Sequence, residues 1–447
     1  MAESINLTAM AEPYSIYLPS VQPYSATRIV GEDHKLREGK LPCGLHAADL
    51  NFLDPDNRYW HYKWCLATAG HFKDERKENA ITNKHQKTCI VGDSGGFQIG
   101  KGTLDDIKTW KRHSNDPQRI MSLWRSSDVK NDIVRWLDAN CDWAMTIDIP
   151  IWTIQERASP FRNLTTAQLT ELSEENLRFI SDKRGAFGSC RYLNVLQGKS
   201  EEEEQHWFDA VSKYKFDGWS FAGHVGQVGG IYRVLRRLML LRDKKMLDKG
   251  YDWLHILRLS RMRWTPIMTA IQQQIRKTIN PNFTISYDSS SPYQVGGVAS
   301  KFATMNSFGK NLNKDWSIPI KRFPTGYDAA NALNAMRLDR THEHFLTHPM
   351  ESPIARLLTI QQMNVKTGDM DIKTTDTFAD EVLLNHNLYI FCLANIKANE
   401  AVFKTQTAPD EIMEAVGAIE EIFTATSWKR ALNKHRELLA RVVGDKI

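Results

Sequence analysis

Three aspartates are candidate catalytic residues, because each one ends a short apolar run of the sequence. The runs are Ile-Val-Gly-Asp at Asp93, Met-Thr-Ile-Asp at Asp148 and Ile-Ser-Tyr-Asp at Asp288. One such aspartate is explained well enough as the N-cap of a following helix. Three on the same edge of one parallel sheet would share a cleft, where repulsion raises at least one pKa and separates acid from base roles. We therefore take them as candidate reactive groups.

A carboxylate set of this kind suits glycosyl transfer with retention. One carboxylate attacks the anomeric carbon, while another protonates the leaving group and later takes a proton from the acceptor. When the leaving group is a nucleobase, polar groups that recognise its edge and an aromatic ring that stacks on it are also needed. The sequence offers Gln197 in Asn-Val-Leu-Gln-Gly, Gly223 in Gly-Trp-Ser-Phe-Ala-Gly, and Phe97.

The segment Asp93-Ser94-Gly95-Gly96-Phe97-Gln98 is the most distinctive in the chain. It follows an apolar strand, and its glycines let backbone and ring approach a flat ligand closely. It resembles the DSGGFQ signature of the tRNA-guanine transglycosylases, which exchange a guanine base in a nucleic acid for a 7-deazaguanine.

That resemblance continues in order over about residues 85–300. It implies that Asp93 is the general acid/base, and that Asp288 of Ser-Tyr-Asp-Ser-Ser is the nucleophile, closest to an archaeal-type Phe-Asp-Ser pattern. The base-binding residues it implies are Ser94, Phe97, Gln98, Asp148, Gln197 and Gly223.

The structural zinc of that family is not expected here. Family members bind it through C-x-C-x-x-C and a later His-Asn-Leu. This chain has His386-Asn387-Leu388, but Cys392 is the only cysteine beyond Asp288, and a sulfur-rich tetrahedral site needs more. We expect no metal and no nucleotide cofactor, since one glycosidic bond is exchanged for another of similar energy. Three further histidines could hold a metal in principle but are better explained as surface residues: His342, His344 and His348.

Other departures favour a DNA substrate. The family's glycine-rich end of the seventh strand is Arg258-Leu259-Ser260 here, and neither a Pro-Thr-Arg run after the nucleophile nor an archaeal-type RNA-binding extension is evident. In these departures, and in the segment Tyr17-Leu18-Pro19-Ser20-Val21, the chain is similar to the DNA 7-deazaguanine transglycosylases of phages and bacteria.

This second resemblance implies a free 7-deazaguanine as co-substrate, with the 7-cyano form expected, and a modification that protects DNA against restriction. Accessory modification proteins are further candidate partners. A tRNA substrate in queuosine- or archaeosine-type modification stays open as the alternative, because both nucleic acids present the same phosphates to basic residues.

Basic residues gather in three regions of the sequence, at 111–125, 233–245 and 258–263. Each is individually explained as a solvated helix face, and a net charge of +5 permits nucleic-acid binding without requiring it. Their position near strand ends favours contacts with the nucleic-acid backbone. The candidates we select are Arg258, Arg261 and Arg263.

Strand–helix alternation predicts the fold. Six β-rich segments, each followed by a helical stretch, are 88–93, 143–148, 192–197, 218–223, 254–260 and 283–288. Two of the expected helices have recognisable starts: Asn163-Leu164-Thr165-Thr166 precedes a helix at 167–180, and Ser200 precedes an acidic first turn at 201–204. With earlier candidates at 15–21 and 44–52 the count reaches eight, which indicates a TIM-type (β/α)8 barrel whose chemistry sits at the carboxyl ends of its strands.

We expect this α/β barrel to occupy residues 1–325 and a helical C-terminal subdomain to occupy 326–447. No apolar run approaches the roughly 20 residues of a membrane span, and the N-terminus lacks the features of a secretory signal. The six cysteines are scattered without a framework spacing. These features predict a cytoplasmic protein with reduced thiols, in the host cytoplasm if the chain is phage-encoded.

Three other functions compete. Residues 95–101 satisfy the P-loop pattern G-x-x-x-x-G-K, but Gly102 replaces the Mg²⁺-binding hydroxyl and bulky Phe97 and Ile99 fill positions that are usually small. A catalytically inactive nucleic-acid-binding barrel would not need both Asp93 and Asp288. A sugar-cleaving glycosidase would use paired carboxylates but does not account for the segment 93–98.

Overall fold

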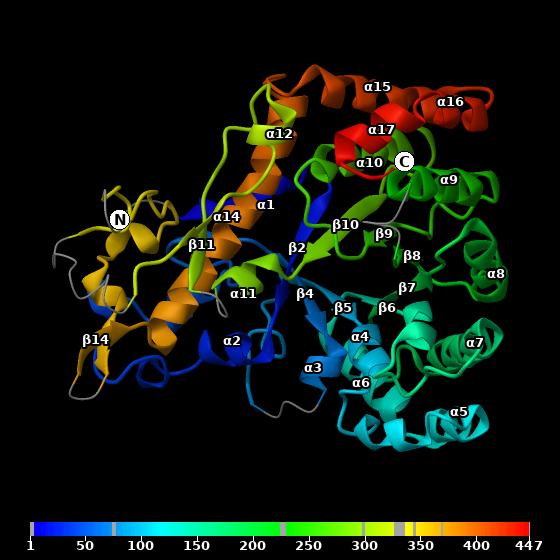
Figure 1. Cartoon of the computed structure of the whole chain (residues 1–447), viewed down its shortest axis with the longest axis horizontal. Coiled ribbons are helices and arrows are strands. Elements are labelled where there is room, and N and C mark those ends of the chain that lie inside the picture. Colours follow the sequence, from blue (N-terminus) through cyan, green and yellow to red (C-terminus); the bar gives the residue numbers. More distant parts are fainter. Residues whose placement is uncertain are drawn as a thin grey trace.

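The computed structural model describes residues 4–73, 77–223, 229–296, 300–325, 336–342, 346–367 and 370–446. Within them, eight parallel strands close into a barrel in the order β10-β2-β4-β5-β6-β7-β8-β9, which confirms the TIM-type architecture (Figure 1). The barrel strands are β2 (Ile16–Val21), β4 (Trp64–Thr68), β5 (Cys89–Asp93), β6 (Trp143–Met145), β7 (Arg191–Leu196), β8 (Gly218–Phe221), β9 (Trp253–Ile256) and β10 (Thr284–Ser289).

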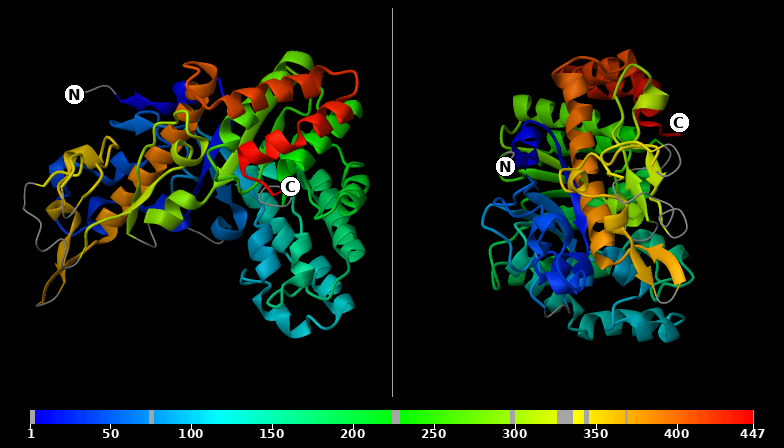
Figure 2. Two further views of the ribbon diagram at one scale, coloured as in Figure 1. Left: turned by 45° about the horizontal axis from the view of Figure 1, so that its top comes forward. Right: turned by 90° about the vertical axis from the view of Figure 1, so that its left-hand side faces the viewer.

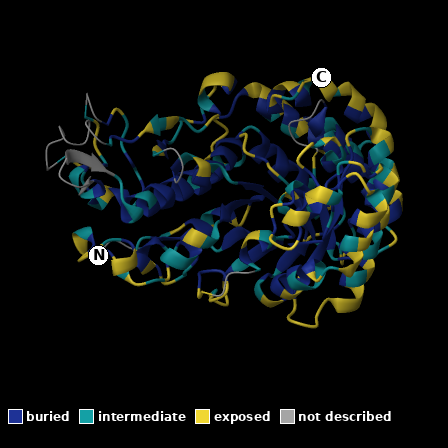
Figure 3. Cartoon of the chain, turned by 60° about the horizontal axis from the view of Figure 1, so that its bottom comes forward, coloured by how far each residue is buried: buried dark blue, intermediate teal, exposed yellow. Residues whose placement is uncertain are grey.

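Helices between successive strands surround the barrel. They are α3 (Ala69–Phe72), α4 (Gly96–Lys101), α5 (Pro117–Ser126), α6 (Val129–Asn140), α7 (Thr166–Lys183), α8 (Glu201–Val211), α9 (Gly230–Asp243) and α10 (Trp264–Thr278). Both expected helix starts are confirmed. The Thr165 side chain accepts from the Gln168 backbone amide, and the Ser200 side chain accepts from the Glu203 backbone amide. Exposed residues lie mainly on the outer faces of these helices (Figure 3).

The barrel interior is packed by side chains. Every residue of β2 and β4 is buried, as expected for parallel strands covered on both faces. Trp143 begins β6 and Trp253 begins β9; these strands are not neighbours, yet the two ring centroids are 4.9 Å apart. The two indoles therefore meet inside the barrel near its amino end, and the carboxyl ends of the strands are left for a site.

The strand predicted at 44–52 is wrong. That stretch contains 3-10 turns at Pro42–Gly44 and Ala47–Leu50, and the second barrel strand is β4. Asp49 explains the turn, because its carboxylate accepts from the His46 amide. The sequence Trp-Cys-Leu-Ala-Thr of β4 is buried throughout and shows no alternation by which a strand could be recognised.

The region after residue 325 becomes α-helical later than expected. Its described residues before Thr377 contain 3-10 turns, at Ala355–Leu357 and Gln361–Met363, and a hairpin of β13 (Val365–Thr367) and β14 (Met370–Thr374). The helices that follow are α14 (Thr377–Phe403), α15 (Asp410–Thr424), α16 (Trp428–Lys434) and α17 (Arg436–Val443). The expected helical C-terminal region is thus confirmed, and residue 326, where its boundary was predicted, lies outside the described residues.

These C-terminal helices pack on the barrel. Helix α14 packs against the outside of the barrel, in contact with β2 and α10. Helix α15 packs on α10, and α17 packs on α9 (Figures 1 and 2). Smaller described elements are β1 (Ile5–Asn6), α1 (Leu7–Ala11), α2 (Pro23–Arg28), β3 (Trp60–His61), α11 (Ser291–Gly296), β11 (Lys301–Ala303), α12 (Leu312–Asp315) and β12 (Ile320–Arg322). None of the described helices is both long enough and apolar enough to cross a membrane.

Candidate active site

The structure brings the predicted carboxylates to one rim of the barrel. Asp93 is the last residue of β5, and Asp288 is the next-to-last of β10. Gln197 directly follows β7, and Asp148 lies just beyond β6. Because all the barrel strands run parallel, these four side chains occupy the same end of the barrel.

A cavity of about 620 Å³, here called the Asp288 cavity, contains both candidate catalytic carboxylates, Asp93 and Asp288. Its other polar lining residues are Ser20, Gln22, Thr68, His71, Gln98, Arg258, Ser260, Ser289, Ser290, Ser291 and Gln294. The two carboxylates therefore face one space, as paired acid and nucleophile chemistry requires.

Asp93 is held at both oxygens. Its Oδ1 accepts from the Gly95 amide at 3.2 Å, and its Oδ2 accepts from the Thr68 hydroxyl at 3.4 Å. Burial raises the pKa of Asp93, and the charge of Asp288 raises it further, against the hydrogen bond from Gly95 that lowers it. A carboxyl group that keeps its proton more readily than usual is suited to donate it to a leaving group.

Asp288 is bound through one oxygen. Oδ1 accepts from the Arg258 amide at 2.7 Å and lies 3.3 Å from Nε2 of His255. The Arg258 backbone has φ of 63°, a left-handed conformation that is uncommon for a residue with a side chain. No described residue hydrogen-bonds to Oδ2, so this oxygen is available to attack.

A second cavity, of about 250 Å³, is called here the Asp148 cavity. Ligand sites usually start at about 300 Å³, so it suits a compact ligand. It is lined by Asp93, Gly96, Phe97, Asp148, Pro150, Ile151, Trp152, Gln197, Gly198, Lys199, Ala222, Gly223, Leu257 and Arg258.

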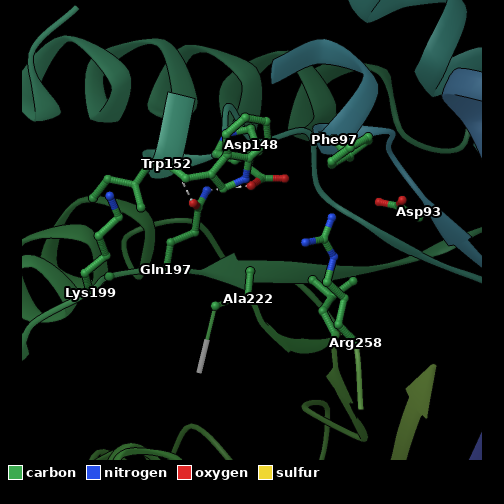
Figure 4. Close-up of a pocket in the computed structure, with 14 residues that line it drawn as sticks. Asp93, Phe97, Asp148, Trp152, Gln197, Lys199, Ala222 and Arg258 are labelled. Atoms are coloured by element: carbon green, nitrogen blue, oxygen red, sulfur yellow. Dashed lines mark hydrogen bonds between the residues drawn. The ribbon is translucent and has the colours of Figure 1, made fainter. Parts of the chain in front are cut away.

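Asp148 and Gln197 are hydrogen-bonded to each other in that cavity. Gln197 Nε2 donates to Asp148 Oδ2 at 2.5 Å, and Gln197 Oε1 accepts from the Ile151 amide at 2.8 Å (Figure 4). Burial, and then the charge of Asp93, raise the pKa of Asp148 to about 7, against the hydrogen bond from Gln197 that lowers it. Gln197 therefore orients Asp148, which lines the cavity with one oxygen held by this amide.

Phe97 and Arg258 separate the two cavities and line both of them. The Phe97 side chain is 44% exposed, and the Arg258 guanidinium carbon lies 5.2 Å from its ring centroid (Figure 4). The Phe97 ring is thus partly exposed to solvent. The Arg258 guanidinium lies over the face on which a flat ligand would stack. Trp152 approaches Phe97 from the Asp148 cavity, with ring centroids 5.9 Å apart.

The other base-binding candidates are placed differently from one another. Gly223 lines the Asp148 cavity with φ of +76°, a conformation that favours glycine, and no described residue lies within 4 Å of where a Cβ would be. Gln98 lines the Asp288 cavity instead, and its Nε2 lies 2.6 Å from His71 Nε2. Ser94 is fully buried and lines neither cavity.

The arginines predicted to contact a nucleic-acid backbone lie beside the site. Arg261 and Arg263 line a third cavity, of about 520 Å³, which shares Ser260 and Ser291 with the Asp288 cavity. Arg261 donates to the Gly444 carbonyl at 2.6 Å. Arg263 donates to Asn313 Oδ1 at 2.9 Å.

The basic region at 233–245 is partly structural. Arg237 is 1% exposed and its Nε lies 2.7 Å from Glu204 Oε1, while Arg233 lies 3.5 Å from the other oxygen of Glu204. These two arginines join α9 to α8 in the interior, where they cannot contact phosphates. Glu204 comes from the acidic start of α8, and sequence spacing gave no sign of this pairing.

The residues present do not fit the zinc site of the resembling family. His386 is buried in α14, and both ring nitrogens are occupied, Nδ1 by Ser352 Oγ and Nε2 by the Ala303 carbonyl, each at 2.9 Å. Burial lowers the pKa of His386 to about 4. Among the described residues no three potential ligands gather. His342 and His348 are partly exposed, and His344 lies outside the described residues.

The P-loop-like segment does not form a phosphate cradle. Residues 96–101 form helix α4, and Lys101 stands at its last position, where its Nζ lies 2.5 Å from Glu156 Oε2. A P-loop lysine instead starts its helix and faces the phosphates. This geometry argues against a P-loop nucleotide site here.

Comparison of the chain with models of known protein families, and with curated proteins, finds no match. The function is therefore inferred from the geometry of the site and from the resemblance of its motifs.

Sequence reasoning missed two polar residues of this site. His255 is fully buried in β9 beside Asp288, and His71 follows β4 in the wall of the Asp288 cavity. The signal for His255 was available, because it is the only ionisable residue in the apolar stretch Trp-Leu-His-Ile of β9. His71 could not be predicted at the barrel rim, because the second strand was expected at 44–52 and His71 follows the actual second strand, β4.

Proposed function

We propose that this chain is a base-exchange transglycosylase that replaces guanine in DNA by a free 7-deazaguanine, through a covalent Asp288–deoxyribosyl intermediate. One observation carries the proposal. Asp93 lies between a cavity that holds a second carboxylate with a free oxygen, Asp288, and a smaller cavity with a buried Asp148–Gln197 pair.

In the first half-reaction the target nucleotide is flipped out of the duplex, with its sugar in the Asp288 cavity and its base in the Asp148 cavity. Asp288 Oδ2 forms a bond to C1′ while the C1′–N9 bond breaks, and the electron pair of that bond leaves with the guanine. Asp93, whose raised pKa favours the protonated form, supplies the proton to the leaving guanine.

In the second half-reaction guanine is replaced by the free 7-deazaguanine, for which the 7-cyano form is the expected substrate. Asp93, now ionised, removes the N9 proton of the incoming base. N9 then attacks C1′, the ester bond to Asp288 breaks, and its electron pair returns to the carboxylate. Neither an oxidant nor a nucleotide cofactor takes part.

Base recognition follows from the chemistry of the Asp148 cavity. The Watson–Crick edge of guanine and of a 7-deazaguanine presents N1–H and N2–H donors, which an ionised Asp148 accepts. Gln197 holds that carboxylate in place, and Phe97 provides the stacking face once the Arg258 guanidinium moves aside. Gly223 contributes backbone and no side chain to the cavity wall.

The choice of DNA over tRNA rests on the resemblance described above. Arg258 lines the Asp288 cavity and Arg261 and Arg263 line the cavity beside it, which supports their proposed role in binding the phosphates on either side of the flipped nucleotide. The resemblance also supports a role in protecting the modified DNA from restriction, with accessory modification proteins as partners.

The test is mass spectrometry of nucleosides from the DNA and tRNA of cells that express the chain and are supplied with 7-cyano-7-deazaguanine. We expect the deazaguanine nucleoside in DNA with the wild type and its absence with Asp288→Ala. Incorporation into tRNA alone would overturn the DNA assignment but leave the chemistry standing. A wild-type protein that binds nucleic acid but exchanges no base would overturn the proposal that the chain is an enzyme.

A further inference from the structure

A line of buried polar side chains leads from the barrel interior to Asp288. Trp253 and His255 are two residues apart on β9, and Ser286 and Asp288 are two residues apart on β10. Residues at this spacing share one side of a strand, and His255 and Ser286 are register partners. All four side chains therefore lie on the inner side of the barrel, stacked from the indole layer up to the rim.

Short contacts join these four side chains in sequence. Trp253 Nε1 donates to Ser286 Oγ at 2.7 Å, and that oxygen lies 2.9 Å from His255 Nδ1. His255 Nε2 lies 3.3 Å from Asp288 Oδ1, within ion-pair distance, and forms no hydrogen bond with any described residue in this geometry. His255 and Ser286 have no exposed surface, so water does not compete for these contacts.

Hydrogen-bond chemistry gives the line a direction. An indole N–H can only donate, so Ser286 Oγ accepts from Trp253 and has its own proton to give. When the serine donates that proton to Nδ1, the neutral ring carries its proton on Nε2, the nitrogen that faces the Asp288 carboxylate. The opposite tautomer would set the lone pair of Nε2 against an ionised oxygen in a buried place, which is costly.

We propose that Trp253, Ser286 and His255 form a relay that fixes the Nε2–H tautomer of His255 and so positions Asp288 for attack. Oδ1 of Asp288 accepts from the Arg258 backbone amide and then faces the Nε2–H of His255 at 3.3 Å. These two contacts restrict rotation of the carboxylate, and Oδ2 remains as the attacking atom. His255 is a positioning residue, and this role rests on the proposed function of Asp288.

The tautomer can be measured without any activity. In protein labelled with ¹⁵N-histidine, the ring signals that are lost in His255→Gln identify His255, and we expect them to show the neutral Nε2–H form. His386 shows the same form, because its Nε2 donates to the Ala303 carbonyl, but its signals remain in this variant. Ser286→Ala should move this ring toward the other tautomer or toward a mixture. A wild-type His255 that carries its proton on Nδ1, or on both nitrogens, would overturn the relay.

A matched control lies on the neighbouring strand. Ser220 is the register partner of His255 on β8, is fully buried, and its hydroxyl has no partner among the described residues. Ser220→Ala therefore makes the same chemical change in the same layer of the barrel without removing a hydrogen bond of the relay. Thermal melting of both alanine variants checks that each is folded.

Kinetics give the second readout. We expect Ser286→Ala to slow formation of the covalent DNA adduct by about 10- to 100-fold, with DNA affinity unchanged, because a displaced nucleophile loses its approach geometry. Ser220→Ala should leave both quantities as in the wild type. Equal slowing by both variants would overturn the positioning role. Should the predicted tautomer be found in a wild type that exchanges no base, the relay stands and only the proposed function fails.

Discussion

The Asp148 cavity and the Asp288 cavity share Asp93, yet their polar groups are paired differently. In the Asp148 cavity, the amide of Gln197 is bonded to Asp148 and to the backbone of Ile151, so the surface is already rigid. In the Asp288 cavity, Asp288 is bound at Oδ1 alone. A surface that recognises a ligand gains from groups fixed in advance, whereas a nucleophile must keep one atom free to form a bond.

The largest difference between the cavities should appear when the free oxygen is removed. Asp288→Asn keeps the shape of the side chain but cannot form the ester, so we expect base exchange to fall by about 10⁴-fold or more. Binding of free 7-deazaguanine, measured by calorimetry, should stay near the wild-type value. A variant that loses base binding as well would show that the two cavities do not act separately.

Asp93→Asn tests the carboxylate that both cavities share. Removing a general acid/base costs about 10²- to 10⁴-fold, and we expect a loss of this size in both half-reactions. Single-turnover measurements of guanine release and of deazaguanine incorporation check this. If only one half-reaction slowed, a second acid or base would be required beside Asp93.

Asp148→Asn addresses recognition alone. A carboxylate that accepts two N–H groups contributes about 1–3 kcal/mol of discrimination, so the affinity for free 7-deazaguanine should fall by about 10- to 100-fold. Gln197→Glu, which places a second carboxyl group against Asp148, should weaken binding in the same direction. A free base that binds the Asp148→Asn protein as tightly as the wild type would contradict this use of the cavity.

The pH dependence of base affinity tests the same role of Asp148. Asp148 has a pKa of about 7 in the folded protein, and its ionised form is the one that accepts from the base. Base affinity should therefore be constant above pH 7 and fall about tenfold per pH unit as pH decreases below 7. Calorimetric titrations between pH 5.5 and 8.5 test this, and the dependence should be absent in Asp148→Asn.

The smallest expected effect concerns Phe97 and Arg258, which line both cavities. Arg258 covers Phe97 with a cation–π contact worth about 0.5–1 kcal/mol at an exposed site. Arg258→Gln should uncover the ring and tighten binding of the free base by about 2- to 5-fold, while DNA affinity falls and its dependence on salt weakens. Weaker base binding in this variant would instead mean that the guanidinium itself stacks on the base.

The rim of the barrel could be predicted from sequence, because Asp93, Asp148 and Asp288 each close an apolar run, and strand ends meet in a barrel. Strand β4 could not, since Trp64–Thr68 is buried on both faces and carries no alternation. The internal pairing of Arg237 with Glu204 was equally hidden, because sequence does not reveal which charges face inward. Gln98 was assigned to the base by its motif, whereas its side chain lines the other cavity.

Whether Asp288 forms a bond to the sugar is tested most directly by mass spectrometry of the protein after incubation with guanine-containing DNA and acid quenching. We expect a covalent adduct whose peptide map locates the deoxyribosyl group on Asp288, with release of one guanine per adduct and no adduct in Asp288→Asn. An adduct on another residue, or base exchange that persists in Asp288→Asn, would contradict the assignment of Asp288 as nucleophile.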